Sequence, residues 1–221
     1  MGGDRHDKVG TYPLENRLMT LKRKVRDIVG IRYRFALFYA FPGGLRFELS
    51  DGDSPLDQVL TALRKASVIC EDMFRDEERI LVHLQAVGST SRFGFRDMLR
   101  ELKLAGIIIP EAREIWVDGV NGDGGDGSGN WVDCAFELPV TKLQNLLWCA
   151  VVSNVELFRP NPQCRVYLLN ARKGLVCHVY DDRGMDIIGQ QKSALIELYR
   201  RHKECLLPHD MEAMRRTFDP S

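Results

Sequence analysis

Two pairs of short apolar segments constrain the fold of this chain more than any other feature. Residues 164–169 (CRVYLL) and 175–180 (LVCHVY) flank the turn sequence NARKG, which predicts a β-hairpin. Residues 114–117 (EIWV) and 132–138 (VDCAFEL) predict a second strand pair, and the longer segment shows the period-two alternation of a half-buried strand. Strands that follow each other this closely pair antiparallel, because parallel strands need a long crossover connection.

Further strands are predicted nearer the N-terminus. Residues 34–40 (RFALFYA) and 45–49 (LRFEL) surround the turn FPGG and predict another hairpin. Residues 79–87 (RILVHLQAV) predict a single strand with His83 on the face opposite Ile80. We expect His83 to be a paired or partly exposed strand histidine, with a role as ligand or base as the alternative.

Helical spacing of apolar residues separates these strands. Ser54 with Pro55 after it predicts a helix start, and Gly106 predicts a helix end. Thr141 with Gln144 has the pattern of a capping box. The predicted helices centre on residues 14–28, 55–74, 95–102, 143–151, 194–199 and 211–218.

This order of elements predicts an α+β fold, with a largely antiparallel sheet built from hairpins and covered by helices. We expect residues 1–13 to be a disordered or extended N-terminal segment and residues 14–217 to form a single domain. Residues 119–130, which include NGDGGDGSGN, are expected to be a Gly-rich loop insertion, because they match neither the spacing of a calcium loop nor that of a phosphate loop.

The composition argues against several classes of function. The 221 residues carry a formal net charge of zero, whereas nucleic-acid binding usually requires a basic excess. A basic run at residues 22–26 leaves nucleic-acid binding as a weaker alternative to a solvated helix face. The sequence has no apolar run of about 18 residues and no hydrophobic signal core. We therefore expect a cytoplasmic protein that does not bind membranes.

The sequence shows no pattern typical of a zinc site or of a serine nucleophile. Its six cysteines are scattered and form no CxxC pair, so we expect reduced and mostly buried thiols. Cys177 and His178 are neighbours in a predicted strand, which places their side chains on opposite faces. We expect no cofactor, no resident metal and no catalytic residue.

The stretch VYDDRGMDIIG, residues 179–189, is the main candidate for a functional site. We read it as a strand, a tight turn at 181–184 with Gly184 at positive φ, and a helix start near Gly189. Ile187 and Ile188 are expected in the core. The candidate binding residues are Asp181, Asp182, Arg183 and Asp186, and their alternative role is that of a purely structural turn.

Two segments carry a resemblance to a known family. LFYAFPGGLRFEL, and VYLLNARKGLVCHVYDDRGMDIIG with the helix that follows it, resemble a bacterial family known as the domain of unknown function 3885. The resemblance covers residues 14–217, and YDDRGMD is its most specific part. The tryptophan usual after the family's final helix is replaced near Cys205. The resemblance implies an intracellular bacterial protein and supplies no catalytic residue to carry over.

Two classes of function remain. The first hypothesis is a non-catalytic protein-binding module, of the kind that neutralises a toxin, whose acidic turn would attract a basic protein partner. The alternative is a metal-dependent hydrolase of phosphoesters. It would use the carboxylates of residues 181–186 with His178 nearby, and it requires these side chains to converge in a pocket.

Overall fold

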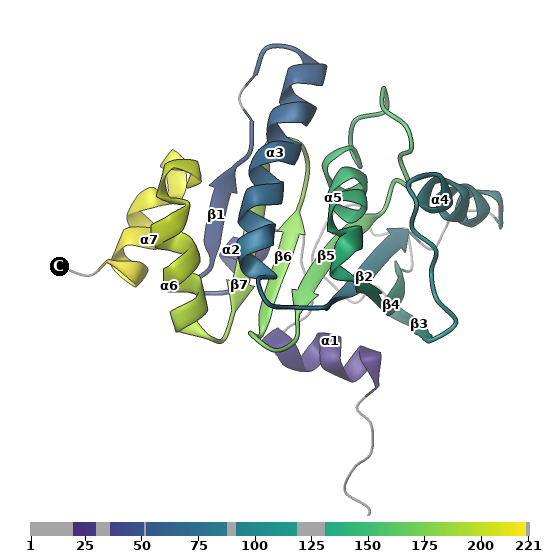
Figure 1. Ribbon diagram of the computed structural model, residues 1–221, viewed down its shortest axis with the longest axis horizontal. Helices are drawn as coiled ribbons and strands as arrows, with labels where there is room; N and C mark the ends of the chain where they lie inside the picture. The colour runs from purple at the N-terminus through teal and green to yellow at the C-terminus, as the bar shows by residue number, and fades with distance from the viewer. Residues whose placement is uncertain (1–19, 30–35, 51, 88–91, 119–130, 220–221) are drawn as a thin grey trace, which may run out of the picture.

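A computed structural model describes residues 20–29, 36–50, 52–87, 92–118 and 131–219. These residues build one seven-stranded antiparallel sheet with the order β1-β7-β6-β5-β2-β4-β3 (Figure 1). The strands are β1 Leu45–Glu48, β2 Arg79–Val87, β3 Arg113–Asp118, β4 Trp131–Pro139, β5 Arg165–Asn170, β6 Leu175–Val179 and β7 Gly184–Gly189. The predicted α+β fold with an antiparallel sheet is confirmed.

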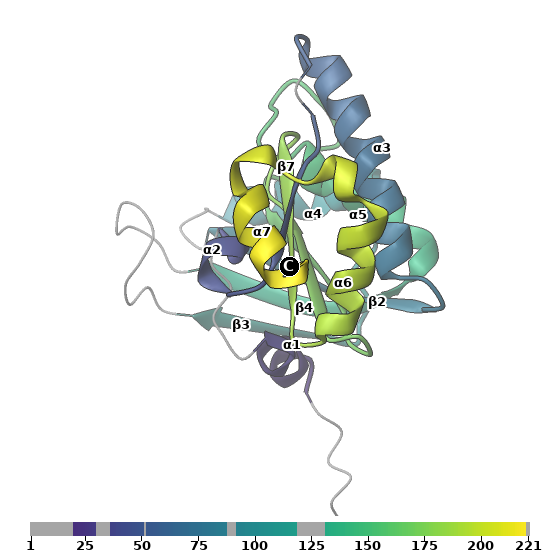
Figure 2. The same ribbon diagram turned by 90° about the vertical axis from the view of Figure 1, so that its left-hand side faces the viewer.

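Helices cover both faces of the sheet. They are α1 Leu21–Val29, α2 Leu37–Ala40, α3 Pro55–Met73, α4 Arg92–Leu104, α5 Leu143–Val151, α6 Lys192–Arg201 and α7 Met211–Phe218. Figure 2 shows α3, α5 and α6 on one side of the sheet and α2 on the other. The main apolar core lies under α3, α5 and α6, and a smaller cluster on the opposite face includes Val25 of α1 and Leu37 of α2.

Several local sequence patterns predicted the helix ends and strand pairs correctly. The Ser54 hydroxyl accepts a hydrogen bond from the Asp57 backbone N–H at 3.1 Å, which caps α3. Gly106 ends α4 with a φ of +75°, a conformation that glycine adopts without steric cost. The pairs β3–β4 and β5–β6 form as predicted.

The predicted strand over residues 34–40 is wrong. In its described part, residues 37–40 form the single helical turn α2, in which the Phe41 N–H bonds to the Leu37 carbonyl at 2.9 Å. The Phe38 N–H at the start of this turn donates to Asp186, which lies 148 residues away in sequence. A distant carboxylate therefore stabilises this turn, and no local pattern could report it.

Strand β1 is consequently not half of a local hairpin. It lies at an edge of the sheet and pairs only with β7 among the described strands, with Leu45 opposite Ile187 and Arg46 opposite Asp186. Leu45 and Phe47 face the main core. The other face of β1 buries Arg46.

Two helix starts also differ from the predictions. The Thr141–Gln144 capping box does not form, because residues 140–142 make a 3₁₀ turn and the Gln144 side chain bonds to Ser67 and Glu71 of α3. The chain reaches Gly189 as strand β7, and α6 begins three residues later at Lys192. The predicted segment 1–13 and the Gly-rich loop 119–130 lie outside the described residues.

Candidate functional site

The 181–186 segment is the turn and first half of a β6–β7 hairpin. Asp181 accepts the Arg183 backbone N–H at 2.8 Å and binds the Arg183 guanidinium through Nε at 3.0 Å and Nη2 at 2.6 Å. An aspartate that bonds the backbone two residues ahead closes a tight turn. Asp181 is buried, whereas the Arg183 side chain is 75% exposed.

Gly184 is required by close packing and not by its backbone conformation. The prediction of a positive φ at Gly184 is wrong, because the positive-φ glycines of the described chain are Gly43, Gly106 and Gly174. A Cβ at position 184 would overlap the Tyr180 hydroxyl and lie 3.0 Å from the Phe47 carbonyl oxygen. Glycine therefore allows the Tyr180 ring to lie across the hairpin beside β1.

Asp186 points away from the turn and forms a buried ion pair with Arg46, its neighbour across β1 and β7. Arg46 Nε donates to Oδ1 at 2.8 Å and Nη2 donates to Oδ2 at 3.2 Å, so the guanidinium binds both carboxylate oxygens. The Phe38 N–H adds a third donor at 3.0 Å. Asp186 is fully buried, and Arg46 is 9% exposed.

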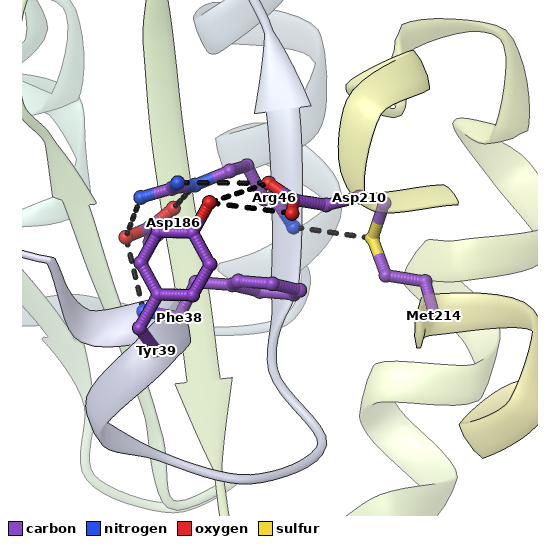
Figure 3. A network of polar contacts seen from close by, with 6 residues as sticks. All are labelled: Phe38, Tyr39, Arg46, Asp186, Asp210 and Met214. Carbon is purple, nitrogen blue, oxygen red and sulfur yellow. Dashed lines mark hydrogen bonds and ion pairs between the residues drawn. The ribbon is translucent and has the colours of Figure 1, made fainter. Parts of the chain in front are cut away.

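The same guanidinium reaches a second carboxylate at the start of α7. Arg46 Nη1 lies 3.6 Å from Asp210 Oδ2, and the Tyr39 hydroxyl donates to the same carboxylate at 3.2–3.3 Å (Figure 3). The Met214 sulfur accepts the Arg46 backbone N–H at 3.4 Å. We call Tyr39, Arg46, Asp186 and Asp210 the Arg46 network. It joins α2, β1, β7 and the segment that leads into α7.

Aromatic rings enclose the guanidinium of this network. The Arg46 Cζ atom lies 4.5 Å from the Tyr39 ring centroid, 5.3 Å from that of Phe38 and 5.4 Å from that of Tyr180. Rings at such distances stabilise a cation electrostatically. Tyr39 is nevertheless 62% exposed, so the network holds a large aromatic side chain at the protein surface.

Burial determines the electrostatics of this region. Burial opposes the charge of Arg46, but its hydrogen bonds and ion pair with Asp186 outweigh that effect and raise its pKa, so it stays protonated. Burial raises the pKa of Asp186, while the donors Arg46 and Phe38 oppose this shift. Burial and the charge of Asp181 raise the pKa of Asp182. Burial and the charge of Asp186 raise the pKa of Tyr180 to about 12.

A row of rings continues from the network across the same sheet face. The rings of Trp116, His83, Tyr167 and His178 stack in sequence, with centroid distances of 5.4, 5.4 and 4.4 Å. His83 Nε2 lies 2.7 Å from Oδ1 of the buried Asp133, which confirms the prediction of a paired strand histidine.

The thiols lie in the hydrophobic core. Cys177 faces the side covered by α3, α5 and α6, with its sulfur 3.7 Å from that of Cys70, while His178 lies on the opposite side as predicted. All six cysteines are free, and five are buried. Burial raises the pKa of Cys134 to about 11 and that of Cys149 to about 12, which disfavours the reactive thiolate.

The structure separates the four candidate residues predicted from sequence. Asp181, Asp182 and Arg183 lie in the turn, and Asp186 lies in the Arg46 network. An acidic turn that attracts a basic partner needs exposed carboxylates, but all three carboxylates are buried and the exposed charge belongs to Arg183. Within the described ranges, no group of three His, Cys, Asp or Glu is arranged to hold a metal ion.

Sequence reasoning missed three members of the network, Tyr39, Arg46 and Asp210. One signal was present for Arg46, because a cation on the polar face of a predicted strand needs a carboxylate if that face is buried. The sequence did not show that β7 would supply this carboxylate.

No helix in the described part of the chain is both long and apolar enough to cross a bilayer.

These features define an α+β domain in which one antiparallel sheet carries a buried ionic network on the face that α1 and α2 cover. The chain belongs to the family described as Domain of unknown function (DUF3885), whose match spans residues 21–210. The matched range ends at Asp210 and contains the whole Arg46 network. Neither a curated protein nor a solved structure matches the chain.

Proposed function

We propose that this protein is a non-catalytic protein-binding module that uses Tyr39 as the anchor of its contact surface. The observation that carries the proposal is the combination of exposure and restraint at this residue. The Tyr39 ring is 62% exposed, its hydroxyl is bonded to Asp210 and its face lies on Arg46. Exposed aromatic side chains that are already ordered bind with little loss of conformational entropy and often dominate interface energies.

The 181–186 segment supports the same proposal. Asp181 orients the exposed Arg183, and Asp186 positions α2 through Arg46 and the Phe38 N–H. Tyr180 joins the two regions, because it precedes the turn and its ring contacts Arg46. We propose that Arg183 binds an acidic group of the partner, while the aspartates act by holding Arg183 and Tyr39 in place.

One form of this function is the neutralisation of a toxin by direct capture, as immunity proteins do. The experiment that tests it uses the products of the genes that neighbour its own gene as candidate partners. Each is purified and titrated against this protein by calorimetry. Tyr39→Ala should weaken capture by about 2 kcal/mol, whereas Leu157→Ala, at a position 77% exposed, should change it by well under about 1 kcal/mol.

Charge substitutions separate binding from catalysis. Arg183→Gln should weaken capture modestly, with a larger effect at low salt, because the exposed Arg183 charge mainly affects association. Asp181→Asn should weaken capture to a smaller extent, because Asp181 then holds the Arg183 guanidinium less firmly. The control incubates the parent protein with divalent metal and para-nitrophenyl phosphate. Hydrolysis that disappears in a folded Asp182→Asn variant would overturn the binding proposal and favour the metal-dependent hydrolase.

A further inference from the structure

A polar cavity opens at one end of the sheet, next to His178 of the row of rings. Its volume is about 450 Å³, within the range of small-molecule sites. It lies where β2 and β6 end and where β4 and β5 begin, and residues 153–156 after α5 close one side. It is separate from Tyr39, the anchor of the proposed protein contact, although Tyr180 lines the cavity and also contacts Arg46.

Two buried acceptors beside this cavity lack donors. Gln85 lines the cavity, and its Nε2 donates to Asp133 Oδ1 at 2.8 Å, which determines the orientation of its amide. Gln85 Oε1 and Asp133 Oδ2 are both buried and have no hydrogen-bond partner in the described part of the chain. Asp133 is only 1% exposed. Buried acceptors are usually satisfied, so Gln85 Oε1, which belongs to a residue that lines the cavity, indicates a donor group that enters from outside the protein.

The cavity walls favour a flat ligand. Trp131 and Tyr180 line it, together with the imidazole of the buried His178. The Arg165 Cζ atom lies 4.2 Å from the Trp131 ring centroid, which places a planar cation against one wall. Aromatic rings and guanidinium planes stack well on heterocyclic rings. Gln85 supplies an acceptor, so the ligand needs an N–H group.

We propose that this cavity binds a small planar heterocycle that carries N–H donors, the chemistry of a nucleobase in a free nucleoside. An N–H group of the ring bonds to Gln85 Oε1, and the ring stacks on the wall formed by Trp131 and the Arg165 guanidinium. This site goes beyond the proposed protein contact, and neither depends on the other.

The test titrates the whole protein with adenosine, cytidine, uridine and inosine separately, each to roughly 1 mM, by calorimetry and saturation-transfer NMR. At least one nucleoside should bind. Gln85→Leu and Trp131→Leu should each weaken that binding about tenfold, through the lost acceptor and the lost stacking surface.

Gln85→Leu also removes a hydrogen bond to Asp133, so a second variant tests the cavity without removing that bond. Ser153 lines the cavity, and Ser153→Trp should fill it and block binding while Gln85 keeps its bond to Asp133. The matched control Ser193→Trp places the same side chain at an exposed position of α6 and should leave binding unchanged. The proposal is overturned if none of the four nucleosides binds, in which case water satisfies the two acceptors, or if folded Ser153→Trp binds like the parent.

Discussion

Replacing Arg46 by methionine tests the Arg46 network most directly. The change removes both guanidinium bonds to Asp186, at 2.8 and 3.2 Å, and the contact with Asp210 at 3.6 Å. Asp186 would then be a fully buried carboxylate that keeps the hydrogen bond from the Phe38 N–H. Removing one partner of a buried ion pair costs about 3–5 kcal/mol of unfolding free energy, because the other charge is left uncompensated.

The assay is urea unfolding followed by circular dichroism. A loss of that size should lower the midpoint by roughly 2 M urea. The matched control is Arg183→Met, because Arg183 also binds an aspartate but is 75% exposed. That pair should contribute about 0–1 kcal/mol, since solvent screens it. If Arg46→Met and Arg183→Met lower the stability equally, the buried network does not have the energetic role argued here.

A double variant separates uncompensated charge from lost packing. Arg46→Met combined with Asp186→Leu removes both charges, so it should be more stable than Arg46→Met alone, although the Phe38 N–H loses its acceptor. We expect the double variant to lose less unfolding free energy than the sum of the losses of the two single variants. A double variant that is as unstable as the sum of the two single variants would contradict the ion-pair interpretation.

Three further predictions follow from single positions. The raised pKa of Asp182 means that its folded pKa exceeds its unfolded pKa, so the stability present at low pH is lost as pH rises through the folded pKa. Asp182→Asn should therefore be more stable than the parent at pH 7, with a gain that shrinks toward about pH 4 in thermal melts, and a pH-independent difference would refute this. Gly184→Ala should cost about 1–3 kcal/mol in urea unfolding through overlap with Tyr180, and added Tyr180→Phe should restore part of that loss; no restoration would exclude the hydroxyl as the cause. Ile187→Asp should cost several kcal/mol because it buries a charge, whereas Ile108→Asp, at a position 71% exposed, should shift the melting curve little; equal shifts would contradict the core position of Ile187.

Strands with a clear alternation could be predicted from the sequence, and one without alternation could not. Strand β2 was predicted with its observed bounds, since its main-core residues recur at every second position. Strand β7 was missed because it is buried on both faces and its residues, GMDIIG, show no period of two. Residues 34–40 were mistaken for a strand because a short apolar run does not distinguish a strand from a helical turn.

The candidate site was located in sequence, but its geometry was not. The 181–186 segment does contain Asp186, a central member of the Arg46 network. The carboxylates are nevertheless buried, because Asp186 lies in β7 and faces the buried Arg46, while Asp181 bonds to the backbone of its own turn. Arg46 is 140 residues from Asp186 in sequence, and they became neighbours only when β1 paired with β7.

The sequence by itself determined which residues of β2 and β4 share a face, where α3 starts and where α4 stops, because side-chain periodicity, Ser54 capping and the Gly106 conformation are local properties. The tertiary structure decided the strand order and therefore which polar groups meet on the sheet face that α1 and α2 cover. Arg46 is buried because β7 supplies Asp186, α7 begins beside Asp210 and α2 places Tyr39 over the guanidinium. The free energy of a buried charge depends on partners that the rest of the chain delivers, so no local pattern encodes it.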